Sequence, residues 1–169
     1  NKAQATLLLG EGTSNDAAVS LDTVTGTVVD LKALVLGTTD TIKTLKATGA
    51  ASNVADAKLL SALATTVTYE LQDTAKDLAA AGSDILNSAT KITATGSTTL
   101  AQSRILDAAT ATDEKTLFTL ADSATNILGA TVAELTRGQG ANNTITVTNA
   151  SDSPVSAATV TSLRKLDSD

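Results

Sequence analysis

Hydrophobic and polar residues alternate along this chain with two different periods. Some short stretches have a period of two, as where Ile92, Ala94 and Gly96 fall on one face and Thr93 and Thr95 on the other. Such stretches are rich in threonine and β-branched residues and predict β-strands. Other stretches place apolar residues three or four positions apart, which predicts amphipathic helices. The helical sets are Ala75, Leu78, Gly82 and Ile85, and Ala124, Ile127, Leu128, Thr131 and Leu135.

The alternation of strand and helix is repeated along the chain. Segment 69–75 recurs at 118–124, an offset of 49 residues. Two further series interleave with it in a constant order, at 45–49, 92–96 and 145–149, and at 54–60, 100–106 and, more loosely, 155–163. Successive strand-like segments are about 23–28 residues apart. One strand and one helix therefore form a unit of that length.

Turn residues occupy equivalent places in these units. Gly49, Gly96 and Asn149 follow the strand-like segments of one series. Glycine and asparagine are the residues that tolerate a positive φ, so a left-handed backbone position is expected there. Asp73 and Asp122 directly precede alanine-containing segments and are predicted to be N-caps of the helices that follow.

Two further helix starts are indicated by local chemistry. Asn53 with Asp56 three residues later resembles an imperfect capping box. Ser153 precedes Pro154, the one proline of the chain, and proline is tolerated at the first position of a helix.

This order of elements predicts an α/β fold. A helix between two strands returns the chain to the same end of the sheet, so the strands should be parallel. Such crossovers are right-handed in nearly all proteins, and repeated units would stack as a right-handed β-α repeat solenoid with a parallel sheet. Residues 1–18 do not fit the repeat, and within them 5–9 is a candidate strand and 10–16 a candidate loop. The repeat domain is expected to cover 19–169.

Composition narrows the possible functions. The 169 residues carry a net charge of −6 and include no Cys, His, Met or Trp. Zinc sites of the usual kind and nucleophiles activated by histidine are therefore excluded, and no catalytic residues are proposed. The net negative charge and the absence of a Lys/Arg cluster argue against binding to nucleic acid. No apolar run approaches the roughly 18 residues needed for membrane insertion. The chain begins at Asn1, without an initiator Met or a signal segment, which is typical of a processed chain or a piece of a longer protein.

Few residues are candidates for binding chemistry. Gly10-Glu11-Gly12 lacks the third glycine of a dinucleotide-binding turn. Glu11, Asn15, Asp16 and Asp22 supply oxygen ligands that could hold calcium, and a solvated acidic loop is the alternative. Asp40 and Asp152 could equally supply an oxygen ligand to a metal, and neither position is specific for one. No other cofactor is expected.

The threonines and the two aromatic residues have both structural and functional interpretations. Thr93, Thr95, Thr146 and Thr148 form a predicted ladder that could bind ice or sugar, although threonine in strands more often forms cross-strand contacts. Tyr69 and Phe118 share one position of the repeat, which indicates core residues.

Four segments of this chain are similar to known repeats, namely 69–78, 92–96, 100–102 and 118–127. They resemble the Ala/Thr-rich repeats of very large secreted or surface-anchored bacterial proteins. That family is of the surface-layer, adhesin or matrix type. The resemblance implies an extracellular or cell-surface location and no catalytic residues. We therefore expect a structural or adhesive module, not an enzyme, that self-associates into a filament or surface layer. The alternative is a module that binds a ligand or glycan on its sheet face.

Overall fold

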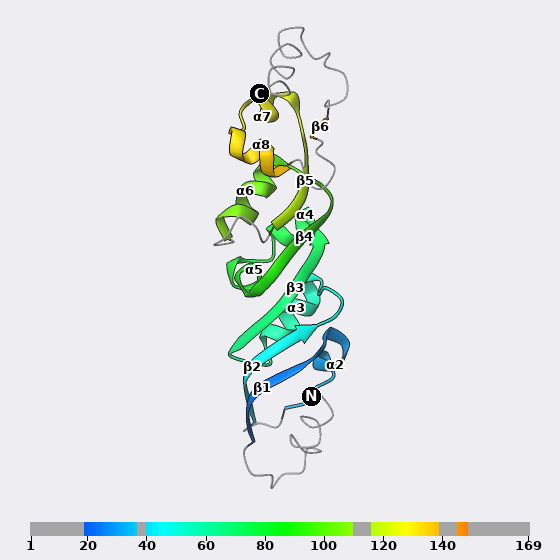
Figure 1. The fold of residues 1–169 in the computed structure, drawn as a ribbon, viewed down its shortest axis with the longest axis vertical. Helices are drawn as coiled ribbons and strands as arrows, with labels where there is room; N and C mark the ends of the chain where they lie inside the picture. The colour runs from blue at the N-terminus through cyan, green and yellow to red at the C-terminus, as the bar shows by residue number, and fades with distance from the viewer. Residues whose placement is uncertain (1–18, 37–39, 110–115, 139–144, 149–169) are drawn as a thin grey trace. The chain divides into compact units, whose positions relative to one another are not determined.

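The computed structural model describes residues 19–36, 40–109, 116–138 and 145–148, and strands alternate with helices along them (Figure 1). The strands are β1 (Ser20–Thr27), β2 (Thr41–Thr48), β3 (Thr66–Thr74), β4 (Ala89–Thr98), β5 (Thr116–Asp122) and β6 (Thr146–Val147). The helices are α2 (Val28–Lys32), α3 (Val54–Ser61), α4 (Ala75–Ala79), α5 (Ser83–Ser88), α6 (Leu100–Ala109), α7 (Ala124–Leu128) and α8 (Val132–Gly138).

The strands form one six-stranded parallel sheet whose spatial order follows the chain, β1-β2-β3-β4-β5-β6. The predicted α/β class and the parallel sheet are therefore confirmed. Ser20 pairs with Thr41, an offset of 21 residues. Thr44 pairs with Thr66 and Ala121 with Thr146, offsets of 22 and 25 residues.

The chain divides into two compact units. The N-terminal unit comprises residues 1–73 and 81–92, and the C-terminal unit comprises 74–80 and 93–169. Each unit has its own buried core, so we describe the two separately.

The largest fully buried side chains of the N-terminal unit include several leucines and one tyrosine. Leu45, Leu60 and Leu71 are almost fully buried. Tyr69 is 1 % exposed, and its hydroxyl donates a hydrogen bond of 2.8 Å to the backbone oxygen of Ile85. The polar end of this large side chain is thereby satisfied inside the core.

The core of the C-terminal unit is likewise built from large apolar side chains, with a phenylalanine among them. Leu100, Leu120, Ile127 and Leu135 form a buried cluster, against which Ala130, Ile145 and Val147 pack. Phe118 is 4 % exposed. The prediction that Tyr69 and Phe118 are core residues is confirmed.

The predicted faces of strand β4 are confirmed except at its glycine. Ile92 and Ala94 are buried, Thr93 is half-buried and Thr95 is exposed. Gly96 is exposed and does not continue the buried face formed by Ile92 and Ala94. Its φ of 74° takes the backbone out of the regular strand geometry that alternation assumes.

The two turn glycines behave as predicted. Gly49 and Gly96 have φ values of 89° and 74°, in the left-handed region. Asn149, the third member of this series, lies outside the described residues.

The two long apolar patterns each correspond to a pair of short helices, not to one. Helix α4 ends at Ala79, and Gly82, with a φ of 91°, precedes α5. In the second case α7 ends before Gly129 and a new helix, α8, begins after Thr131. Apolar residues keep a spacing of three or four positions across such a break, so periodicity alone could not locate the break. None of the described helices is long and apolar enough to cross a membrane.

Candidate functional site

The helices that follow β3 and β5 are capped by hydroxyl side chains. Thr74 Oγ1 accepts a hydrogen bond of 3.1 Å from the amide of Asp77, and Ser123 Oγ accepts one of 3.3 Å from the amide of Asn126. The prediction that Asp73 and Asp122 cap these helices was therefore wrong by one residue. Each aspartate belongs to the preceding strand, and the residue after it supplies the cap.

Asp73 and Asp122 instead contact the helix of the preceding unit. Asp73 Oδ2 accepts a hydrogen bond of 2.9 Å from the amide of Val54, the first residue of α3. Asp122 Oδ2 accepts one of 2.8 Å from the amide of Leu100, the first residue of α6. We call these two side chains the cross-repeat carboxylates. The same contact occurs once in each compact unit and joins one strand–helix unit to the next.

The environment of Asp122 favours its charged form. Its Oδ1 accepts hydrogen bonds from the Ser123 amide (2.7 Å) and from Asn126 Nδ2 (2.8 Å), and the residue is 8 % exposed. Burial by itself raises the pKa of Asp122, but the hydrogen bonds from Leu100, Asn126 and Ser123 outweigh it, so the pKa lies below its ordinary value. A negative charge at the start of α6 is also favoured by the partial positive charge there.

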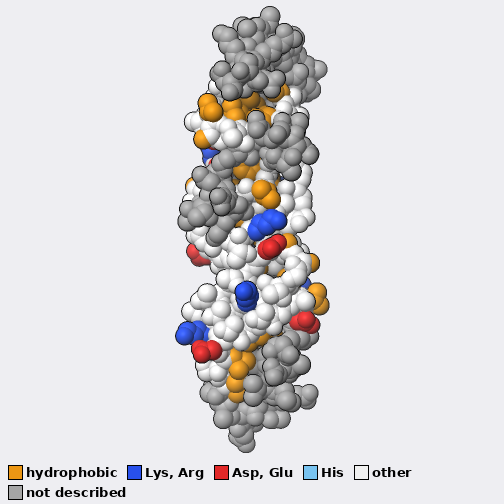
Figure 2. Space-filling model, viewed as in Figure 1, with side chains coloured by type: hydrophobic (Ala, Val, Ile, Leu, Met, Phe, Trp, Pro, Cys, Tyr) orange, Lys and Arg blue, Asp and Glu red, His pale blue; other side chains and the backbone are white. Residues whose placement is uncertain are grey.

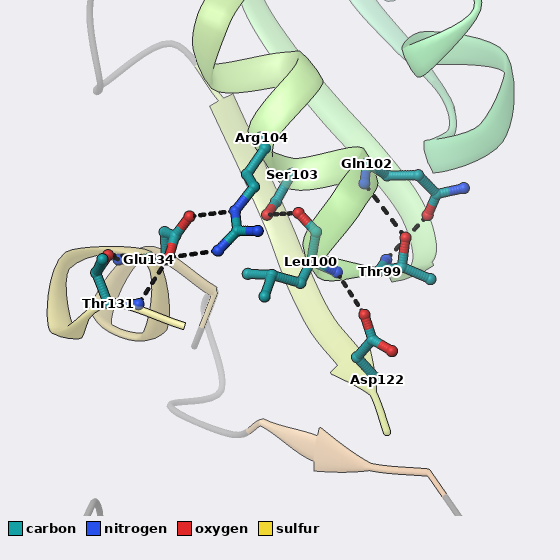
Figure 3. Close-up of polar contacts among 8 residues, drawn as sticks. All are labelled: Thr99, Leu100, Gln102, Ser103, Arg104, Asp122, Thr131 and Glu134. Carbon is teal, nitrogen blue, oxygen red and sulfur yellow. Dashed lines mark hydrogen bonds and ion pairs between the residues drawn. The ribbon is translucent and has the colours of Figure 1, made fainter. Parts of the chain in front are cut away.

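The helix starts held by these carboxylates carry caps of their own. Asn53 Oδ1 accepts a hydrogen bond of 2.7 Å from the Asp56 amide, which confirms Asn53 as the N-cap of α3. Before α6, Thr99 Oγ1 accepts from the Gln102 amide at 3.2 Å, while Gln102 Oε1 accepts from the Thr99 amide at 2.9 Å. This reciprocal pair is a capping box, and Figure 3 shows it beside the contact between Asp122 and Leu100.

An ion pair adds a second link within the C-terminal unit (Figure 3). Arg104 Nε on α6 lies 2.7 Å from Glu134 Oε1 on α8. Glu134 Oε2 also accepts a hydrogen bond of 2.7 Å from the amide of Thr131, the residue before α8. These donors, Arg104 first, lower the pKa of Glu134 to about 2. The two charged residues are 30 positions apart, so no local pattern predicted the pair.

The predicted calcium ligands are only partly within the described structure. Glu11, Asn15 and Asp16 lie outside the described residues, as does Asp152. Asp22 is exposed, and its Oδ1 lies 3.7 Å from Lys43 Nζ. The described residues contain no group of three or more acidic side chains that could hold a metal ion. Asp40 Oδ1 accepts a hydrogen bond of 3.0 Å from the amide of Val19.

The predicted threonine ladder does not form between neighbouring strands. Thr93 and Thr95 lie on β4 and Thr146 on β6, and β5 separates these strands in the sheet order. In the N-terminal unit the register aligns a different row, Thr23, Thr44 and Thr66, in which Thr23 and Thr66 are exposed and Thr44 is half-buried. In the view of Figure 2, charged side chains are scattered singly or in pairs over a mostly uncharged surface. This row is identified by the pairing register of the strands, and that register could not be predicted from the sequence.

Comparison with known protein families, with characterised proteins and with solved structures gave no significant match. The function must therefore be argued from the arrangement itself. Its recurrent polar feature is the cross-repeat carboxylate, which accepts hydrogen bonds from the chain's own backbone. Such contacts hold successive units together.

Proposed function

We propose that this chain is a structural or adhesive repeat module of a bacterial extracellular or cell-surface protein, and that it self-associates into a filament or surface layer. The observation that carries the proposal is the repeated contact between a strand aspartate and the preceding helix start, at Asp73 and Asp122. A protein built from equivalent units joined by equivalent contacts is suited to a scaffolding role.

In this proposal the fold is a right-handed β-α solenoid. Right-handed crossovers are the general rule for parallel strands joined by helices. The proposed unit of about 23–28 residues overlaps the register offset of 25 between β5 and β6, while the offsets at β1–β2 and β2–β3 are slightly shorter. The parallel sheet and its sequential strand order support such a stack.

Self-association is supported by the nature of the outer strands. β1 and β6 are the first and last strands in the sheet order of the described residues. The outermost strands of a sheet present backbone donors and acceptors to any strand that can pair with them. The extracellular location rests on the resemblance to surface-protein repeats and on the acidic, cysteine-free composition.

Electron microscopy of the purified chain over a range of concentrations, with calcium and with a chelator, tests the proposal. Filaments or sheets that grow with concentration are the expected result, and loss of assembly in chelator would assign calcium a role. Deletion of residues 1–9, which include the candidate strand at 5–9, is expected to abolish assembly. Monodisperse particles in every condition would contradict self-association, and unchanged polymers after the deletion would exclude that segment from the contact.

A further inference from the structure

The division of the chain into two compact units does not follow the order of its helices. Helix α4 belongs to the C-terminal unit, although it precedes α5, which belongs to the N-terminal unit. The chain therefore enters the C-terminal unit at residue 74, returns to the N-terminal unit at 81 and leaves it again at 93. Between the two helices the backbone turns at Gly82, whose φ is 91°. Residues 74–92 thus supply one helix to each unit.

The contacts of the two helices support this assignment. Helix α4 packs against α6, and the side chain of Leu78 on α4 is fully buried. Helix α5 packs against α3, and Leu86 on α5 is 1 % exposed. The backbone oxygen of Ile85, also on α5, accepts the hydrogen bond from the buried hydroxyl of Tyr69. Each helix is therefore part of the core of the unit to which it belongs.

Polar contacts between distant segments follow the same division. Each cross-repeat carboxylate lies in the same unit as its donor, Asp73 in the N-terminal unit and Asp122 in the C-terminal unit. The ion pair between Arg104 and Glu134 also lies within the C-terminal unit. Strand β4 contributes residues to both units and contains no acidic residue, so it cannot supply such a carboxylate to the start of α4. These contacts therefore stabilise each unit from within.

We propose that the two compact units unfold in two separate steps, and that α4 unfolds with the C-terminal unit while α5 unfolds with the N-terminal unit. Part of a protein unfolds as one step when its elements share a core and its contacts are mostly internal. Repeat proteins, in which each element contacts mainly its neighbours, allow such partial unfolding. The chain can then lengthen in stages, one unit opening while the other stays folded. This inference concerns a single chain and does not depend on the self-association proposed above.

Two spectroscopic signals distinguish the units. Tyr69 is the one tyrosine of a chain without tryptophan, so tyrosine fluorescence reports on the N-terminal unit. Circular dichroism reports on the helices of both units. Urea unfolding of the full chain, followed by both signals, would compare the natural protein with Leu78→Ala and with Leu86→Ala. The two variants are matched, because the same side chain is shortened at two almost fully buried positions.

The expected effects are opposite to the order of the two residues in the chain. Leu78→Ala should raise the unfolded population of the C-terminal unit at least about 30-fold, because it removes buried apolar atoms there. It should shift one step of the circular dichroism transition and leave the Tyr69 transition in place. Leu86→Ala should shift the Tyr69 transition to lower urea. Leu59→Ala is the control, because Leu59 on α3 is 57 % exposed, and it should shift neither signal.

Separation of the two transitions in the variants would confirm two steps, since coincident transitions are the mark of a single one. Coincident transitions in every variant would overturn the inference. A shift of the Tyr69 transition by Leu78→Ala, or no shift by Leu86→Ala, would equally overturn it. If Leu78→Ala prevents the C-terminal unit from folding, Tyr69 should still unfold cooperatively in urea, and loss of both signals would contradict the inference. Leu78→Val and Leu86→Val, which remove less volume, repeat the comparison if an alanine variant does not fold at all.

Discussion

Replacing Asp122 by asparagine should loosen the start of helix α6, although the two side chains have the same shape. The carboxylate accepts three hydrogen bonds, from the Leu100 amide on one oxygen and from the Ser123 amide and Asn126 Nδ2 on the other. Asparagine has a single acceptor oxygen. If that oxygen keeps the two bonds to Ser123 and Asn126, the NH₂ group faces the Leu100 N–H, and two donors then oppose each other.

The size of the effect follows from burial. Leu100 is 4 % exposed and Asp122 is 8 % exposed, so little water can replace the lost acceptor. A hydrogen bond to a charged group contributes about 1.5–3 kcal/mol, and an unpaired buried donor costs a similar amount. We expect Asp122→Asn to lower the free energy of unfolding of the C-terminal unit by about 2–3 kcal/mol. Asp73 is half-buried, and Asp73→Asn should cost the N-terminal unit only about 1 kcal/mol.

Hydrogen exchange of the Leu100 amide, together with urea unfolding followed by circular dichroism, measures both quantities. Ser123→Ala is the matched control: it removes the cap of α7 at a cost of about 1 kcal/mol but should leave exchange at Leu100 nearly unchanged. A cost below about 0.5 kcal/mol for Asp122→Asn, or unaltered protection of Leu100, would refute the role assigned to the carboxylate. An equal effect of Asp73→Asn would refute the dependence on burial.

Three further results are expected. The pKa of Glu134 is lowered to about 2 from an ordinary 4.5. Its ion pair with Arg104 should therefore stabilise the protein above pH 4.5, and this stabilisation should be lost as the pH falls toward 2. In an acid titration followed by circular dichroism, Glu134→Gln should remove this part of the pH dependence. Burial raises the pKa of Tyr69, although hydrogen bonds with nearby serines partly oppose the rise. The stability of the protein should therefore fall above pH 10. Tyr69→Phe should lessen this fall, at a cost of about 1 kcal/mol in stability at neutral pH. Gly49→Ala should destabilise the protein by about 1 kcal/mol in thermal unfolding because its φ is 89°, whereas Gly129→Ala, with a φ of −89°, should cost much less; equal costs would contradict the strain argument.

Local features of this fold could be predicted because they depend on residues close in sequence. The positive φ of Gly49 and Gly96 follows from the absence of a Cβ. The cap at Asn53 needs only an amide three residues away. The helix breaks at Gly82 and Gly129 were missed because apolar residues keep a helical spacing on both sides of each break.

The sequence alone determined the alternation of strand and helix, the α/β class, the parallel strands and the burial of Tyr69 and Phe118, since each depends on periodicity or on the equivalence of repeats. The tertiary structure decided which groups meet across units. Asp73 and Asp122 looked like caps of their own helices, yet each binds a helix start 19 or 22 residues earlier in the chain. An aspartate at the end of a strand accepts hydrogen bonds from whichever backbone amide lies within reach. Only the stacking of neighbouring parallel units brings the amides of Val54 and Leu100 there.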